Sequence, residues 1–138
     1  MDAPNIAELL IHPAVQEAME QAWNDSMVSD PKRRHEEGGW IFCDTATRTI
    51  SASRAAAGRR ASLNLDSPPL IAGSVIVATF HTHPNPAAAG WTIGPSLSDT
   101  ESAWLDGVPC LIRAEDGIHA TGPEVRRGGL VGNPGFPE

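Results

Sequence analysis

The stretch SVIVATFHTHP, residues 74–84, runs an apolar segment directly into two histidines one residue apart. Its branched and aromatic residues predict a buried strand over residues 74–80. Pro84 has no N–H to donate to a sheet, so we expect the strand to end just after the second histidine. Because alternate side chains of a strand project to the same face, His81 and His83 point the same way and can converge on one metal ion.

Asp99 can supply a third ligand if the intervening loop, residues 84–95, folds back. Zinc commonly takes imidazole nitrogens and a carboxylate oxygen, and a catalytic site keeps one position for water. Helix capping is the alternative, because Ser96-x-x-Asp99 and Ser98-x-x-Glu101 both have the capping-box pattern of a helix start. Capping explains the serines and acidic residues but not the two histidines. Taken without any comparison to a family, the sequence is compatible both with a metal site and with a helix start that binds no metal.

The spacing of apolar residues predicts the other elements of an α/β chain. A 3.6-residue period predicts a helix over residues 12–27, and Pro13 suits its first turn. Strands are expected at 40–43, 108–114 and 118–121, with 47–53 as the hairpin partner of the first, and a second helix at 98–105. Residues 54–70 are predicted to form a loop that leaves room for one short helix.

Composition limits the classes of function. The 138 residues fit one domain, and the net charge of -7 argues against a nucleic-acid partner. The start of the chain lacks the features of a signal peptide, and the apolar stretch 70–80 is too short to span a bilayer. We therefore expect a cytoplasmic protein without a membrane partner. Cys43 and Cys110 stand in separate apolar runs and are interpreted as reduced core residues.

A carboxylate precedes the first predicted strand, at Glu36 and Glu37, and glycines follow it where backbones must pass closely. Glu36-x-x-Gly39, then H-T-H-P at 81–84, then P-S-x-x-D at 95–99 resemble the JAMM (MPN+, JAB1/MPN/Mov34) metalloprotease family. The signature of that family is a glutamate, then H-x-H-P, then S-x-x-D after a short loop. The order of the elements and the two prolines all match.

The resemblance implies a single-domain α/β fold, an MPN/JAB-like curved mixed β-sheet flanked by α-helices, over residues 1–122. The high Gly and Pro content of residues 123–138 predicts a flexible C-terminal tail. The resemblance also implies Zn²⁺ held by His81, His83 and Asp99. Glu36 would act as the general base and Ser96 as a hydrogen-bond donor to the oxyanion. Such enzymes are zinc (iso)peptidases that cleave an amide bond after the tail of a ubiquitin-like or sulfur-carrier protein, so the implied partner is a protein or peptide substrate.

Several features leave alternatives open. The loop 84–95 is five residues longer than is usual for the family, and Trp91 in the inserted part is either a surface anchor or a substrate contact. Aligning Gly39 with the family's glycine selects Glu36 as the base, with Glu37 in reserve. A non-catalytic MPN scaffold and a hydrolase of a non-protein amide are the alternative functions. The segment VRRGG, residues 125–129, resembles the end of a ubiquitin-like tail and could occupy the cleft.

Overall fold

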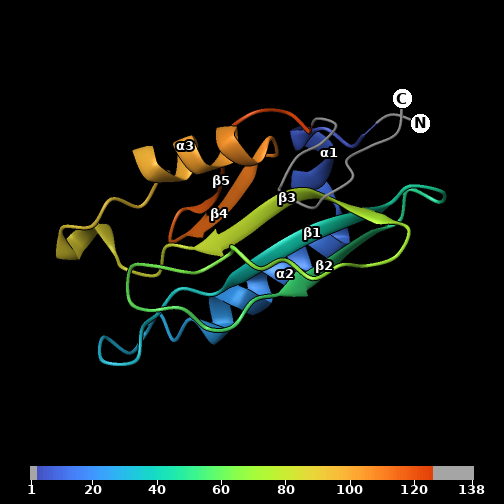
Figure 1. The fold of residues 1–138 in the computed structure, drawn as a ribbon. Helices are drawn as coiled ribbons and strands as arrows, with labels where there is room; N and C mark the ends of the chain where they lie inside the picture. The colour runs from blue at the N-terminus through green and yellow to red at the C-terminus, as the bar shows by residue number, and fades with distance from the viewer. Residues whose placement is uncertain (1–2, 126–138) are drawn as a thin grey trace.

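A five-stranded mixed sheet, in the order β2-β1-β3-β4-β5, forms the centre of the computed structural model, which describes residues 3–125 (Figure 1). β1 is antiparallel to β2 and β3, β3 is parallel to β4, and β4 is antiparallel to β5. The strands are β1 (Gly38–Asp44), β2 (Ile50–Arg54), β3 (Ser74–Thr82), β4 (Cys110–Ala114) and β5 (Gly117–Thr121). The helices are α1 (Ile6–Ile11), α2 (Pro13–Asp25), the 3₁₀ turn η1 (Ala87–Ala89) and α3 (Leu97–Asp106). The prediction of a single α/β domain built on a mixed sheet is confirmed for the described residues.

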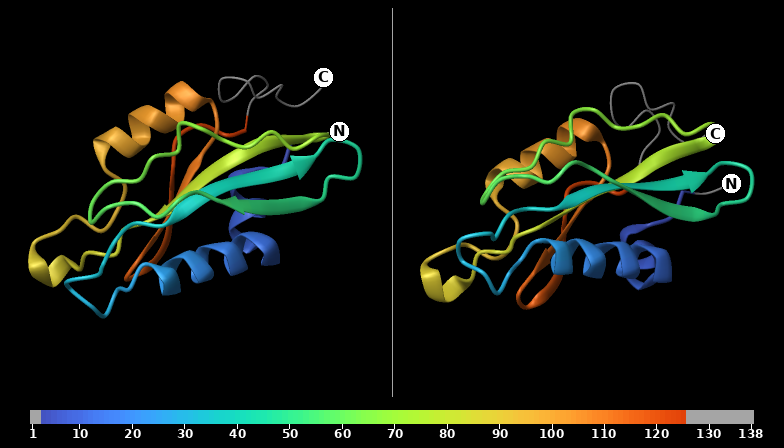
Figure 2. Two further views of the ribbon diagram at one scale, coloured as in Figure 1. Left: turned by 60° about the horizontal axis from the view of Figure 1, so that its bottom comes forward. Right: turned by 90° about the horizontal axis from the view of Figure 1, so that it is seen from below.

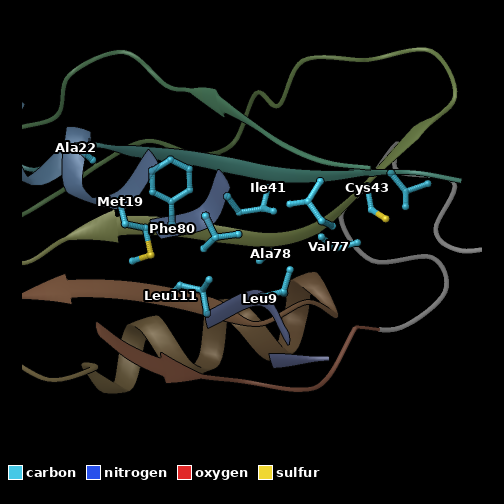
Figure 3. Packing of buried hydrophobic residues seen from close by; sticks show 12 residues of the cluster. Leu9, Met19, Ala22, Ile41, Cys43, Val77, Ala78, Phe80 and Leu111 are labelled. Atoms are coloured by element: carbon cyan, nitrogen blue, oxygen red, sulfur yellow. The ribbon is translucent and has the colours of Figure 1, made fainter. Parts of the chain in front are cut away.

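The helices cover opposite faces of the sheet, with α1 and α2 on one side and α3 on the other (Figure 2). We call these the rear face and the front face. The rear core joins both helices to β1, β3 and β4 (Figure 3), and its buried members include Leu9, Val15, Met19, Ile41, Phe80 and Leu111. Strand β1 is buried on both faces, which explains why it is apolar without alternation.

A bulge in β3 decides which face its histidines occupy. The register between β1 and β3 shifts so that Val77 has no partner, between Ile76 and Ala78. Val77 and Ala78 both belong to the rear core, whereas Ile76 packs in a front cluster. After this extra residue the alternation resumes with Phe80 to the rear, which turns His81 to the front. The unbroken apolar sequence of β3 does not reveal such a bulge.

Close approach of neighbouring strands requires the two glycines that begin β1. A Cβ on Gly38 would lie 2.1 Å from the carbonyl oxygen of Phe80, and one on Gly39 would lie 1.9 Å from that of Ser53. Both distances are far below van der Waals contact. The prediction that backbones pass closely here is confirmed.

The structure differs from the sequence analysis in one helix that was not predicted and in the start of β2. Helix α1 was not predicted, although Asn5 and Glu8 form a capping box at its start. Residues 47–49 belong to a turn and not to β2, because the Asp44 carboxylate accepts the N–H groups of Ala46 and Thr47, and Arg48 has a positive φ of 63°. The loop predicted over residues 54–70 is confirmed apart from Arg54, which ends β2, and the short helix for which it left room does not form.

The C-terminal part of the described chain returns to α1. The N–H of Ile6 donates to Glu124 at 2.9 Å, and Val125 packs against the rear core. Residues 126–138, which hold most of the predicted tail and of the VRRGG segment, lie outside the described residues. Within residues 3–125, none of the helices combines the length and the apolar character that crossing a bilayer requires.

Candidate metal centre

His81, His83 and Asp99 meet at the front of the sheet. His81 is the second-to-last residue of β3, His83 directly follows the strand, and Asp99 is in the first turn of α3. Figure 1 shows the end of β3 on the same side of the molecule as the start of α3. The Nε2 atoms of the two histidines are 3.1 Å apart. Asp99 Oδ1 lies 3.3 Å from His81 Nε2, and Asp99 Oδ2 lies 3.2 Å from His83 Nε2.

Each of these three separations is close to the distance between two ligand atoms of a tetrahedral zinc ion. Bonds of about 2.0–2.1 Å to nitrogen and oxygen give ligand-to-ligand edges of about 3.3–3.4 Å in a tetrahedron. The observed distances of 3.1, 3.2 and 3.3 Å are close to that edge, and the two contacts of Asp99 are made by different oxygens of its carboxylate. Two imidazole nitrogens and one carboxylate also make up the donor set that zinc prefers. The residues present therefore fit a bound zinc ion.

The capping box and the ligand set turn out to share one side chain. Ser96 Oγ accepts the N–H of Asp99 at 3.0 Å, and Asp99 Oδ2 accepts the N–H of Ser96 at 2.9 Å. The cap thus fixes the rotamer that faces the histidines. Of the two predicted capping boxes, the one formed by Ser96 and Asp99 begins α3. Ser98 lies inside the helix and lines the cavity.

The second ring nitrogen of each histidine has its own partner. His81 Nδ1 lies 3.4 Å from Cys110 Sγ, and His83 Nδ1 lies 3.3 Å from the carbonyl oxygen of Ile93. In the neutral form of each ring, a proton on Nδ1 directed to these partners would leave Nε2 with a free electron pair. Both histidines are thereby oriented as ligands of a cation between them and Asp99.

Charge in the cluster is strongly coupled. Burial raises the pKa of Asp99, but hydrogen bonds from His81 and His83 outweigh it and hold the pKa well below its usual range. Burial opposes charge on His81, yet Cys110 and Asp99 outweigh that effect and raise its pKa to about 10. The carboxylate is therefore ionised at neutral pH, and positive charge on the neighbouring His81 is favoured.

The two adjacent glutamates occupy opposite faces of the sheet. Glu36 lines the front cavity and is buried, which raises its pKa, while the charge of His81 partly offsets the shift. Glu37 is equally buried but pairs with His35 at 2.5 Å and with Arg54 at 2.6 Å. Of the two glutamates, Glu36 is the one that borders the cavity of the candidate metal centre.

A cavity of about 860 Å³ extends from the candidate metal centre along α3. Residues 61–68 form one wall, and α3 forms the facing wall with Ser102, Ala103 and Asp106. Ser96 lines the cavity beside Asp99, and Trp91, 40% exposed, lines it from the inserted loop. All the predicted site residues thus border one cavity.

Sequence reasoning missed two residues of this site. Cys110 is buried and free, as predicted for a core residue, but it also lines the cavity against His81. Asn85, 5% exposed, donates from Nδ2 to the carbonyl of Arg60 at 2.8 Å, which ties the residue after H-T-H-P to the wall segment. No local pattern marks either contact, since both depend on pairing between distant segments.

No protein-family model matches the chain, and searches among curated proteins and among solved structures each found no match.

Proposed function

We propose that this protein is a zinc-dependent hydrolase of amide bonds, a JAMM-type (iso)peptidase. The observation that carries the proposal is the cluster of His81, His83 and Asp99, whose nitrogen and oxygen atoms lie close enough to share one metal ion, beside the buried carboxylate of Glu36. Zinc bound there would act as a Lewis acid that polarises a carbonyl and acidifies water. The sequence signature described above supports the same class of enzyme.

Two residues of the chain would carry out proton transfer and stabilisation of the oxyanion. Glu36 would accept a proton from the attacking water and later donate it to the leaving amine. Its burial supports this role, because a raised pKa brings a carboxyl group closer to the working pH. The hydroxyl proton of Ser96 is not used by the helix cap, where its oxygen is the acceptor, so it would donate to the carbonyl oxygen as negative charge develops.

The proposed substrate is an extended protein tail of the ubiquitin-like kind. The cavity continues from the candidate metal centre along α3, which gives room for residues on one side of the cleaved bond. Trp91 lines the same cavity from the inserted loop and would contact that substrate. A non-protein amide would use the same chemistry, so the assay includes small amides beside ubiquitin-like fusions.

The test combines zinc analysis with turnover for a pair of neighbouring variants. Glu36→Gln should keep stoichiometric zinc and lose about 10²- to 10⁴-fold in rate, because an amide cannot accept the proton. Glu37→Gln makes the same change of charge on the rear face and should leave the chemistry in place. Zinc binding without turnover in the wild-type protein would favour a non-catalytic module. Near-normal turnover by Glu36→Gln with none by Glu37→Gln would assign the base to Glu37.

A further inference from the structure

A chain of buried hydrogen bonds lies on the rear face, directly behind the candidate metal centre. Thr82 stands between His81 and His83, and its side chain is fully buried on the opposite side of the strand. Thr82 Oγ1 lies 2.7 Å from Ser26 Oγ and accepts the N–H of Glu37 at 3.0 Å. Strand β3 is tied at this point both to the start of β1 and to the end of α2.

The direction of these hydrogen bonds follows from the number of protons. Ser26 has one hydroxyl proton, and it donates that proton to the carbonyl of Ala22 at 2.8 Å. Thr82 must therefore donate to Ser26 and use its lone pair for the N–H of Glu37. We call these three hydrogen bonds, from Glu37 N–H to Thr82, from Thr82 to Ser26 and from Ser26 to the Ala22 carbonyl, the relay. Each donor in the relay has one acceptor, so only one arrangement of the protons is possible. Breaking the relay would leave a buried N–H unpaired, which is costly in a site that excludes water.

The relay also includes the residue next to Glu36, the proposed general base. Thr82 N–H donates to the carbonyl of Glu37 at 2.9 Å, so the two residues are joined by both backbone and side chain. His35 and Arg54 hold the carboxylate of Glu37 from the other side. Since Glu36 precedes Glu37 directly, the two hydrogen bonds between Thr82 and the backbone of Glu37 hold the chain next to Glu36 in place beside the histidines.

We propose that Thr82 is a positioning residue for the metal centre, an inference that rests on the proposed zinc site. Its hydroxyl contacts no ligand atom. It holds the backbone of His81 and His83 against β1 and α2, so that the nitrogen-to-nitrogen distance of 3.1 Å is set before a metal binds. Metal sites need such supporting contacts to keep their ligands within a fraction of an ångström.

The test compares two substitutions by zinc affinity, measured in competition with a chelator. Thr82→Val keeps the shape of the side chain and removes the hydroxyl, and it should weaken zinc binding about 10- to 100-fold. Thr82→Ser keeps the hydroxyl and should retain affinity within about twofold of wild type. With Co²⁺ in place of zinc, Thr82→Val should alter the d–d absorption bands, whereas Thr82→Ser should reproduce the wild-type spectrum.

Val15→Ala is the matched control, because it removes a buried side chain of the rear core without touching the relay, and its zinc affinity should be unchanged. If Thr82→Val does not fold, Ser26→Ala removes the next link and should lower zinc affinity in the same direction. Wild-type zinc affinity in Thr82→Val, or in Ser26→Ala when that variant replaces it, would overturn this inference alone. Absence of zinc binding in the wild-type protein would overturn the proposed function and this inference with it.

Discussion

His81 and His83 each direct one nitrogen to the candidate metal centre because the other nitrogen has a partner. For His83 the partner is a backbone carbonyl, and for His81 it is the thiol of Cys110. A sulfur is a weaker acceptor than a carbonyl oxygen, so the two ligands are oriented with unequal strength. The chain offers a direct comparison, since Cys43 is a second buried free cysteine away from the site.

Replacing Cys110 by valine should weaken zinc binding several-fold, up to about tenfold, because His81 loses the partner that orients its ring. Cys43→Val removes a thiol of the same kind from the rear core and should leave zinc affinity unchanged. Both affinities are measured by chelator competition. Equal affinities in the two variants would show that Cys110 is only a packing residue.

Zinc affinity should rise with pH because His81 must lose its proton to become a ligand. The pKa of His81 is raised to about 10, so the protonated form predominates below that pH and competes with the metal. Between pH 7 and 9 we expect the apparent affinity to increase about tenfold per pH unit, the slope for release of one proton. Calorimetry in buffers of different ionisation enthalpy counts the protons released. A count of zero at pH 7 would contradict this assignment.

At the scale of elements, the candidate metal centre is made by β3 and the start of α3, and the long loop between them closes it. Ile93 in that loop holds His83, while Trp91 borders the cavity. The loop thus combines a contact that orients a ligand with a side chain placed toward the proposed substrate. The two roles are separable by mutation because different residues carry them.

Trp91→Ala should raise KM for a protein substrate about three- to tenfold while kcat and zinc affinity stay near wild type, because the side chain contacts substrate and not the reacting atoms. Trp104→Ala is the matched control, since Trp104 is also partly exposed, at 54%, but is not part of the cavity lining. Unchanged KM in Trp91→Ala would leave the residue as a surface anchor of the loop.

On the scale of the whole molecule, a zinc ion would join two layers that the fold otherwise connects loosely. The rear core binds α1 and α2 to the sheet through a continuous set of buried side chains. On the front, α3 buries only Ala103 completely and borders the cavity along its length. Asp99 is in α3, whereas His81 is in β3 and His83 directly follows it. A metal ion bound by all three would therefore link α3 to the sheet.

Zinc should therefore stabilise the folded protein. A ligand at about 100 times its dissociation constant adds about 2.7 kcal/mol to the free energy of unfolding, which raises Tm by several degrees in a domain of this size. Removal of zinc with a chelator should reverse the shift in a thermal melt. The double variant His81→Ala, His83→Ala should show no zinc-dependent shift, and a shift that persists there would place the metal elsewhere.

Local patterns determined much of this protein. The apolar runs predicted β1, β3 and β4 because branched and aromatic residues favour buried strands, and the 3.6-residue period predicted α2. The spacing of His81 and His83 predicted that both side chains share a face, since a strand alternates its side chains whatever surrounds it. Each of these inferences needs only neighbours in the chain, which is why the sequence alone was enough.

The tertiary structure was needed to decide between residues that look equivalent in the sequence. Glu36 and Glu37 are alike in sequence, and only the folded chain shows that Glu36 borders the cavity while Glu37 pairs with His35 and Arg54. Cys110 has the sequence context of a core residue and meets His81 because β4 lies beside β3. Such contacts join segments far apart in the chain, and their free energy comes from packing between strands and helices, which no local period encodes.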